Sequence, residues 1–254
     1  MIDTHAHLDG CDVPPEELLA RARAAGVERV ITVGSGIDSC LAALAITERD
    51  PGVFAALGIH PHQAAGEEAS RLDELRELLR HERAVSVGET GLDFYRDWAP
   101  RDRQRNLFAA QLELAAELGK PVVVHNRDAD AETGELLAGF AGTVILHCFS
   151  SPGLLAAALD RGYYVSFAGN VTFAKAEELR AAATQVPAGR ILVETDSPYL
   201  APEPLRGRPN EPANVVHTIA ALARMRAEDA DELAGRIDAN ADAAFSLAVA
   251  SPAS

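Results

Sequence analysis

The chain has 254 residues, of which 48% are hydrophobic, and a formal net charge of −15. This length and apolar content allow one large buried core. The acidic balance argues against a broad basic surface for nucleic acid or an anionic membrane, and arginine supplies nearly all of the cations because Lys120 and Lys175 are the only lysines.

Cysteine usage and hydropathy indicate the compartment. The three cysteines, Cys11, Cys40 and Cys148, are an odd number without paired spacing, which favours a reducing cytosol over a disulfide scaffold. The N-terminus lacks the basic region and apolar core of a signal peptide, and no stretch approaches the roughly 18 apolar residues of a membrane span. We therefore expect a soluble cytoplasmic protein without a membrane partner, and its oligomeric state stays open, a monomer included.

Short apolar runs alternate along the chain with amphipathic stretches of helical length, which is the pattern of βα units. Among the helices, residues 14–25 begin with proline and are followed by glycine, and residues 40–49, 72–79 and 103–118 also have helical periodicity. The expected strands are residues 1–4, 30–34, 53–58, 84–88, 121–125, 143–147, 163–167 and 190–194.

Eight β units with helices between them predict one domain over residues 1–254, folded as an α/β protein of the (β/α)₈ TIM-barrel type. A doubly wound open sheet is the alternative. Residues 93–100 and 197–212 are expected to be loops, the second of them rigid because it contains five prolines. The alanine-rich residues 214–250 predict two C-terminal helices packed outside the barrel.

Side chains that bind metals gather at the carboxyl ends of the expected strands, where the loops of a barrel converge on one cavity. Glu89 directly follows the fourth strand, and Asp196 follows the eighth. A carboxylate at the end of a buried strand is poorly solvated unless a cation meets it, so we expect the site around Glu89. Six of the eight histidines also lie at strand ends: His5, His7, His60, His62, His125 and His147.

The number and type of these side chains predict a metal site. His5 and His7 face the same side of an extended segment because side chains alternate with period two. An isolated pair of this kind also fits simple packing, and the residues at the other strand ends favour a metal. Imidazole with carboxylate suits Zn, Mn, Fe or Ni, whereas Mg prefers oxygen ligands. More candidates are present than one zinc ion needs, which favours two ions and one bridging carboxylate: His5, His7, Glu89, His125, His147 and Asp196.

Six motifs follow one another in order along the chain: HAHLD (5–9), GIHPH (58–62), GETGLDFY (88–95), HNRDA (125–129), HCFS (147–150) and ETDSPYL (194–200). They resemble the TatD family of metal-dependent deoxyribonucleases, and residues 206–212 extend the similarity. The resemblance implies a (β/α)₈ barrel with two divalent ions, expected to be Mg, Mn or Zn. It also implies which residues hold them: His5, His7, Glu89 and Asp196 for one ion, and Glu89, His125 and His147 for the second, with Glu89 as the bridge.

The resemblance further implies hydrolysis of DNA phosphodiesters as a 3′-to-5′ exonuclease. Asp196, beside the first ion, is the candidate for orienting the attacking water and accepting its proton, and Glu89 acts with it through the shared ions. His60 and His62 are candidates for donating to a phosphate oxygen or protonating the leaving group. A rigid turn pinned by Pro61, with one of the two histidines simply packed, is the alternative for that pair.

Three residues are candidates for binding the substrate. Arg127 and Arg206 follow the fifth and eighth strands, where a guanidinium can hold a phosphate through two hydrogen bonds. Tyr95, with its neighbours Phe94 and Trp98, can stack on an unpaired base, although Phe94 or Tyr95 also fits as a plug of the barrel mouth.

The charge of −15 opposes tight binding of duplex DNA. Because salt screens remote charges beyond about 8–10 Å, the local field of two ions can still attract the scissile phosphate. The expected partner is therefore DNA, as single strands or 3′ ends. Two alternatives stay open: an ester or amide hydrolase such as an aminoacyl-tRNA deacylase, because activated hydroxide also attacks carbonyls, and a catalytically silent scaffold with structural metals, against which the intact ligand set speaks.

Overall fold

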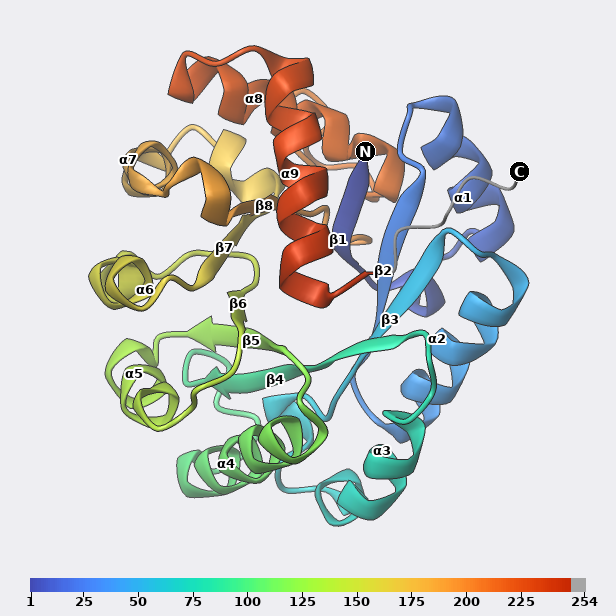
Figure 1. The fold of residues 1–254 in the computed structure, drawn as a ribbon, viewed down its shortest axis with the longest axis vertical. Coiled ribbons are helices and arrows are strands. Elements are labelled where there is room, and N and C mark those ends of the chain that lie inside the picture. The colour runs from blue at the N-terminus through green and yellow to red at the C-terminus, as the bar shows by residue number, and fades with distance from the viewer. Residues whose placement is uncertain (248–254) are drawn as a thin grey trace.

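The computed structural model describes residues 1–247, in which eight parallel strands form one sheet in the order β1 to β8 (Figure 1). Because the strand order follows the chain order and β8 meets β1, the structure confirms the (β/α)₈ barrel and excludes the open, doubly wound sheet. The strands are β1 Ile2–Ala6, β2 Arg29–Gly34, β3 Val53–Leu57, β4 Ala84–Asp93, β5 Val122–Arg127, β6 Val144–Leu146, β7 Tyr164–Phe167 and β8 Ile191–Val193.

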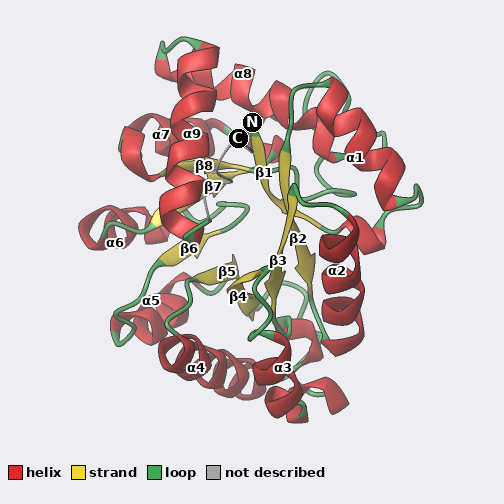
Figure 2. Cartoon of the chain, turned by 45° about the vertical axis from the view of Figure 1, so that its right-hand side comes forward, coloured by secondary structure: helices red, strands yellow, loops and turns green. Residues whose placement is uncertain are grey.

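Helices surround the strands on the outside of the barrel (Figure 2). Their apolar faces and the strands form one buried core, in which Phe108, Phe149 and Phe167 are among the largest fully buried side chains. The helices that alternate with the strands are α1 Pro15–Ala24, α2 Ile37–Arg49, α3 Leu72–Leu78, α4 Arg101–Leu118, α5 Asp130–Ala138, α6 Leu155–Arg161 and α7 Glu177–Gln185.

The barrel closes between β1 and β8 through a mixture of backbone and side-chain hydrogen bonds. Near the carboxyl ends, the backbone N–H of Asp196 donates to the carbonyl of His5 (2.9 Å), and that of His7 to the carbonyl of Ser197 (2.8 Å). Deeper in the barrel, the Asp3 carboxylate accepts from the backbone N–H of Thr195 (2.9 Å) and from its hydroxyl (2.5 Å). These bonds hold the segment that carries Asp196 against the strand that carries His5.

Two C-terminal helices, α8 Val215–Arg226 and α9 Ala230–Phe245, follow the barrel as predicted, and residues 248–250 of the predicted stretch lie outside the described residues. α9 packs across the amino ends of β8 and β2. The Asn240 amide donates to the carbonyls of Ala188 and Ile191, both at 2.8 Å, and Arg29 pairs with Asp242. Because α9 covers this end of the barrel, the carboxyl ends of the strands remain available for a functional site.

Strand β4 differs from the prediction, because it extends past Glu89 and is buried along all ten residues. Thr90–Asp93 pairs with the end of β5 after a shift of register that follows Val87. Gly88 and Gly91 both have φ of +138°, and a Cβ on Gly91 would lie 2.0 Å from the carbonyl oxygen of His125. The placement of Glu89 beyond the strand end is therefore wrong: the two glycines allow the backbone to follow β5 closely, and Glu89 lies within the barrel wall.

Two observations concern the expectations on compartment. Cys11, Cys40 and Cys148 are free thiols. None of the helices in residues 1–247 combines the length and the apolar character needed to span a membrane.

Candidate metal centre

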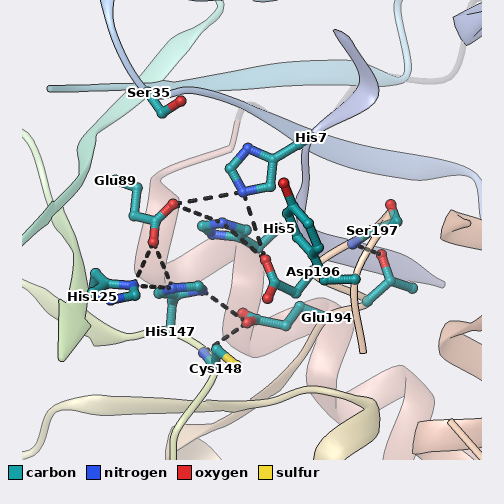
Figure 3. A network of polar contacts seen from close by, with 12 residues as sticks. His5, His7, Ser35, Glu89, His125, His147, Cys148, Glu194, Asp196 and Ser197 are labelled. Carbon is teal, nitrogen blue, oxygen red and sulfur yellow. Dashed lines mark hydrogen bonds and ion pairs between the residues drawn. The ribbon is translucent and has the colours of Figure 1, made fainter. Parts of the chain in front are cut away.

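Glu89 lies between two groups of side chains at the mouth of the barrel (Figure 3). Its Oε2 lies 3.6 Å from Nε2 of His5 and 3.6 Å from Nε2 of His7. Its Oε1 lies 2.7 Å from Nδ1 of His125 and 2.9 Å from Nε2 of His147. The two carboxylate oxygens thus face different histidine pairs, which is the arrangement of a carboxylate that bridges two ions.

The first group consists of His5, His7 and Asp196, whose candidate ligand atoms all lie within 4.8 Å of one another. Asp196 Oδ1 is 3.8 Å from Nε2 of His5 and 3.6 Å from Nε2 of His7. Hydrogen bonds are shorter, about 2.7 to 3.2 Å, whereas ligands that share one ion with bonds of about 2.1 Å lie about 3 to 3.5 Å apart. The spacing therefore fits a cation between these atoms better than direct contact.

His5 gives a second observation in favour of a cation. It is buried, and neither ring nitrogen has a hydrogen-bond partner among the described residues. Buried polar atoms without partners are uncommon in folded proteins. Burial and the neighbouring His147 lower the pKa of His5, so its imidazole is neutral and Nε2 can offer a lone pair. A cation satisfies Nε2, and Nδ1 remains without a partner.

The carboxylates of the site carry charge in spite of burial. Burial raises the pKa of Glu89, but the charge interaction with His147 and the hydrogen bonds from His125 and His147 outweigh burial and hold the pKa well below its usual range. Asp196 behaves in the same way: burial raises its pKa, but His7 and the other nearby imidazoles outweigh burial and lower the pKa below its usual value. Ionised carboxylates, together with imidazoles that release their protons when an ion binds, are a donor set for divalent cations.

The second group consists of His125 and His147 around Oε1 of Glu89, and Glu194 holds His147 in the orientation that this group needs. Its Oε1 accepts from the backbone N–H of Cys148 (2.7 Å) and lies 3.0 Å from Nδ1 of His147, while its Oε2 accepts from the Ser166 hydroxyl (2.5 Å). When the proton of His147 is on Nδ1, its Nε2 has a lone pair that faces Glu89 and can bind an ion. The sequence reasoning gave Glu194 no role. Glu194 and Asp196 both lie past the end of β8, and Asp196 has a φ of +55°, so strand alternation gave no signal for Glu194.

The predicted pair of His60 and His62 has two different environments. Nε2 of His60 lies 3.4 Å from Glu89 Oε1, and the ligand atoms of His60, Glu89 and His125 lie within 4.8 Å of one another, so His60 is a further potential ligand. Burial lowers the pKa of His60 to about 4, which keeps its ring neutral. His62 lies further out, with its ring centroid 4.4 Å from that of Trp98.

Asp93 links His62 to the second group, and the sequence reasoning missed it. Its Oδ2 lies 2.9 Å from Nε2 of His62 and 3.3 Å from Nε2 of His125. Buried Gln104 accepts from the backbone N–H of Asp93 at 2.8 Å. Burial raises the pKa of Asp93, but hydrogen bonds from His125, from a backbone N–H and from His62 outweigh it and lower the pKa. The sequence analysis placed Asp93 at the start of a loop, and only the observed extension of β4 puts it in the same strand as Glu89.

The exposed side chains of Tyr95 and Trp98, in the loop after β4, form an aromatic rim. Tyr95 is 60% exposed and lies under the Arg127 guanidinium, whose Cζ is 4.1 Å from the ring centroid, and Trp98 is 65% exposed. Both rings are thus available for stacking. Phe94 is buried and is covered by the Arg101 guanidinium at 4.4 Å, so the expectation that Phe94 can stack on a base is wrong. Its burial fits the alternative, a plug of the barrel mouth.

The two arginines that are predicted to bind phosphate lie at different places around the barrel mouth. Arg127 belongs to β5 and lies with Tyr95, whereas Arg206 lies in the loop after β8 with its Cζ 4.2 Å above the Phe173 ring. One arginine therefore ends a strand and the other lies in a loop, on different elements around the mouth.

Comparison with known proteins agrees with this geometry. The family model described as TatD related DNase matches residues 2–246. A Mycobacterium tuberculosis protein named metal-dependent hydrolase TatD is 40% identical over 97% of this chain and 98% of its own. A Cronobacter sakazakii protein named 3′-5′ ssDNA/RNA exonuclease TatD is 38% identical over 94% of each chain. The crystal structure of YjjV, a TatD homologue from Escherichia coli, superposes with a TM-score of 0.90 at 30% identity, covering 97% of this chain and 98% of that one.

The barrel, the clustered histidines and carboxylates, and these relatives define the class: the chain is a metal-dependent hydrolase on a (β/α)₈ barrel. Within that class it belongs to the TatD family, since the family model and relatives of 38–40% identity cover nearly its whole length.

Proposed function

We propose that the chain is an exonuclease that uses two divalent ions to hydrolyse phosphodiester bonds of single-stranded DNA from the 3′ end. The observation that carries the proposal is Glu89, whose two oxygens face two separate histidine pairs. The printed name of the Cronobacter sakazakii relative, a 3′-5′ ssDNA/RNA exonuclease, supports the choice of a nucleic-acid substrate.

When bound, the two ions supply positive charge to the phosphate and lower the pKa of a coordinated water. His60 faces the same Glu89 oxygen as the second group and is available to that group as an additional ligand. The residues that would hold the ions are His5, His7 and Asp196 for the first, His125 and His147 for the second, and Glu89 for both.

Asp196 and His62 handle protons in this proposal. The low pKa of Asp196 keeps an ionised oxygen at the mouth, which orients the attacking water and accepts its proton. The Asp93 carboxylate accepts Nε2–H of His62, so His62 protonates the leaving oxygen from Nδ1 as an imidazolium, which becomes the neutral ring with its remaining proton on Nε2 toward Asp93. Nδ1 of His60 accepts the backbone N–H of His62, so Nε2 of His60 faces Glu89 rather than the leaving group.

Substrate contacts come from the rim. Arg127 has no carboxylate within ion-pair distance among residues 1–247, so its guanidinium is available to a phosphate while its plane rests on Tyr95. The exposed ring of Tyr95 offers a face to an unpaired base. Arg206 offers a second cation on the other loop.

A nuclease assay with one substitution tests the proposal. With Mn²⁺ or Mg²⁺, a 5′-labelled single-stranded oligonucleotide should shorten stepwise from its 3′ end, and EDTA should stop the reaction. Glu89→Gln removes the charge shared by both groups and should lower kcat about a thousandfold or more, together with the metal content. Glu113→Gln is the matched control, because Glu113 is exposed on the outside of α4, and it should retain wild-type turnover.

Two results would contradict the proposal. Wild-type protein that releases no nucleotide in an EDTA-sensitive manner, but hydrolyses an aminoacyl ester with the same metals, would replace the phosphodiester by a carboxylic ester as substrate. Glu89→Gln with wild-type turnover would remove Glu89 from its bridging role.

A further inference from the structure

A cavity of about 670 Å³ lies beside the candidate metal centre, between the loops that follow β6, β7 and β8. Ser150, Asn170, Phe173, Lys175 and Arg206 contribute to its lining. It adjoins the centre through Asn170, whose Nδ2 is 3.9 Å from Sγ of Cys148, the residue after His147. The volume is in the range that holds a small organic ligand.

The cations of the cavity are not neutralised by neighbouring side chains. Lys175 and Arg206 are exposed, and neither has a carboxylate within ion-pair distance in the part of the chain that the structure describes. The Arg206 guanidinium rests on the Phe173 ring at 4.2 Å. A guanidinium stacked on an aromatic ring on one side presents its second face for a further planar group.

Asn170 adds a hydrogen-bond acceptor. Its Oδ1 is buried and has no hydrogen-bond partner among the described residues. Buried amide oxygens are normally satisfied, and Asn170 also lines the cavity, so a small movement of its side chain brings this acceptor to a donor on a ligand. The amino or ring N–H group of a nucleobase is a donor of the right kind.

The walls of the cavity are tied together by hydrogen bonds. The Arg180 guanidinium donates to the carbonyls of Phe173 (2.7 Å) and Ala174 (3.2 Å), which fixes the loop after β7. The hydroxyl of Thr172 accepts the backbone N–H of Glu203 at 2.9 Å and joins this loop to the one after β8. These bonds order the backbone of two loops that line the cavity, which lowers the entropy cost of binding.

Two carboxylates, Glu177 and Glu178, also line the cavity. They lie in the first turn of α7, where negative charge offsets the positive end of the helix dipole. Their presence disfavours a simple anion as the ligand. A nucleotide suits the mixed lining better, because it combines one phosphate with a flat base that carries hydrogen-bond donors.

We propose that this cavity binds the nucleotide next to the scissile phosphate of a single-stranded substrate. Lys175 contacts the phosphate of that nucleotide, and its base stacks on the free face of Arg206. The inference rests on the proposed function, since the metal centre supplies the scissile position. It adds a second subsite, so that a substrate of several nucleotides is bound more tightly than a one-nucleotide ester.

Binding of a fluorescent trinucleotide to the metal-free protein in EDTA, measured by anisotropy over a range of salt concentrations, tests the subsite without turnover. Lys175→Ala should weaken binding about fivefold and reduce the slope of log Kd against log salt by about 0.7, the value for one lost phosphate contact on a single strand. Arg206→Lys keeps the charge but loses the flat surface, so it should weaken binding about fivefold without changing the slope. Arg49→Ala is the control, because Arg49 is exposed at the end of α2, away from the strand ends that carry the site.

Turnover with Mn²⁺ separates the two proposals. In the wild type, kcat/KM should be higher for the trinucleotide than for thymidine 5′-(p-nitrophenyl phosphate). Lys175→Ala and Arg206→Lys should each reduce this preference for the trinucleotide. Equal binding of the trinucleotide by the wild type and both variants would overturn the cavity as a nucleotide site. Binding that depends on Lys175 and Arg206 without any metal-dependent hydrolysis would support the nucleotide site and reject the exonuclease.

Discussion

At Glu89, burial and ionic interactions oppose each other. An ionised carboxylate in the barrel wall loses its hydration, which is unfavourable unless cations or hydrogen bonds replace the water. His125 and His147 contact one of its oxygens at 2.7 and 2.9 Å, while His5 and His7 remain 3.6 Å from the other. The longer distances, from Glu89 to His5 and His7, mark the place where a bound cation would contribute most to stabilising the buried charge of Glu89.

Glu194 gives the first prediction at this scale. Glu194→Gln keeps the size of the side chain but removes the charge that holds the proton of His147 on Nδ1. Loss of such a supporting carboxylate lowers metal affinity about 10- to 100-fold. Isothermal titration with Mn²⁺ or Zn²⁺ should show this loss for one of two ions, with Glu113→Gln unchanged. Two binding steps equal to those of the wild type would show that Glu194 does not position His147.

Protons should compete with the metal. Burial lowers the pKa values of His7, His125 and His147, but the carboxylates around them outweigh burial and raise all three. A raised pKa means that these rings keep protons to higher pH in the metal-free protein, and a ligating nitrogen must release its proton. Metal affinity should therefore fall as the pH falls from about 8 to about 6.

Proton release upon metal addition, measured by calorimetry in buffers with different ionisation enthalpies, checks this pH dependence. Metal binding that releases no protons and is equally tight at both ends of that pH range would contradict it.

At the scale of elements, β4 determines the shape of the site. Its extension past Glu89 lets Thr90–Asp93 pair with the end of β5, so that His125 and Asp93 reach the same mouth. The close approach depends on Gly91, where a Cβ would lie 2.0 Å from a backbone oxygen of His125 that cannot move aside cheaply.

Gly91→Ala should therefore destabilise the protein by about 3 kcal/mol or more, because it adds a backbone clash to a φ of +138° that alanine rarely adopts. Gly235→Ala, at an exposed helical position of α9 where a Cβ meets nothing within 4 Å, should instead stabilise it by about 0.5 to 1 kcal/mol. Urea denaturation of both variants measures the difference. Equal stabilities would show that the β4 backbone can relax.

Strand β4 also shows which parts of the fold and of the site could be predicted from the sequence. The apolar runs and helical spacings predict all eight strands, because both periodicities are local properties of the chain. The end of β4 is not predicted, because the glycines at 88 and 91 have the signature of a turn and their pairing with β5 is a tertiary contact. The roles of Asp93 and Glu194 depend on hydrogen bonds between different strands, which spacing alone does not contain.

At the scale of the whole molecule, the distribution of charge accounts for an acidic protein with a proposed anionic substrate. On the outer helices, arginines pair with carboxylates, as in Arg71 with Glu74 and Arg76 with Asp73. At the mouth, within residues 1–247, Arg127 and Arg206 rest on aromatic rings and have no carboxylate partner. These two guanidinium groups are therefore available to an anionic substrate in spite of the net charge of −15.

The central claim is that Glu89 bridges two ions, and anomalous diffraction from crystals loaded with Mn²⁺ tests it most directly. The account predicts two anomalous peaks on either side of the Glu89 carboxylate, one bonded to His5, His7 and Asp196 and the other to His125 and His147. A single peak, or two peaks of which one has no bond to Glu89, would contradict it.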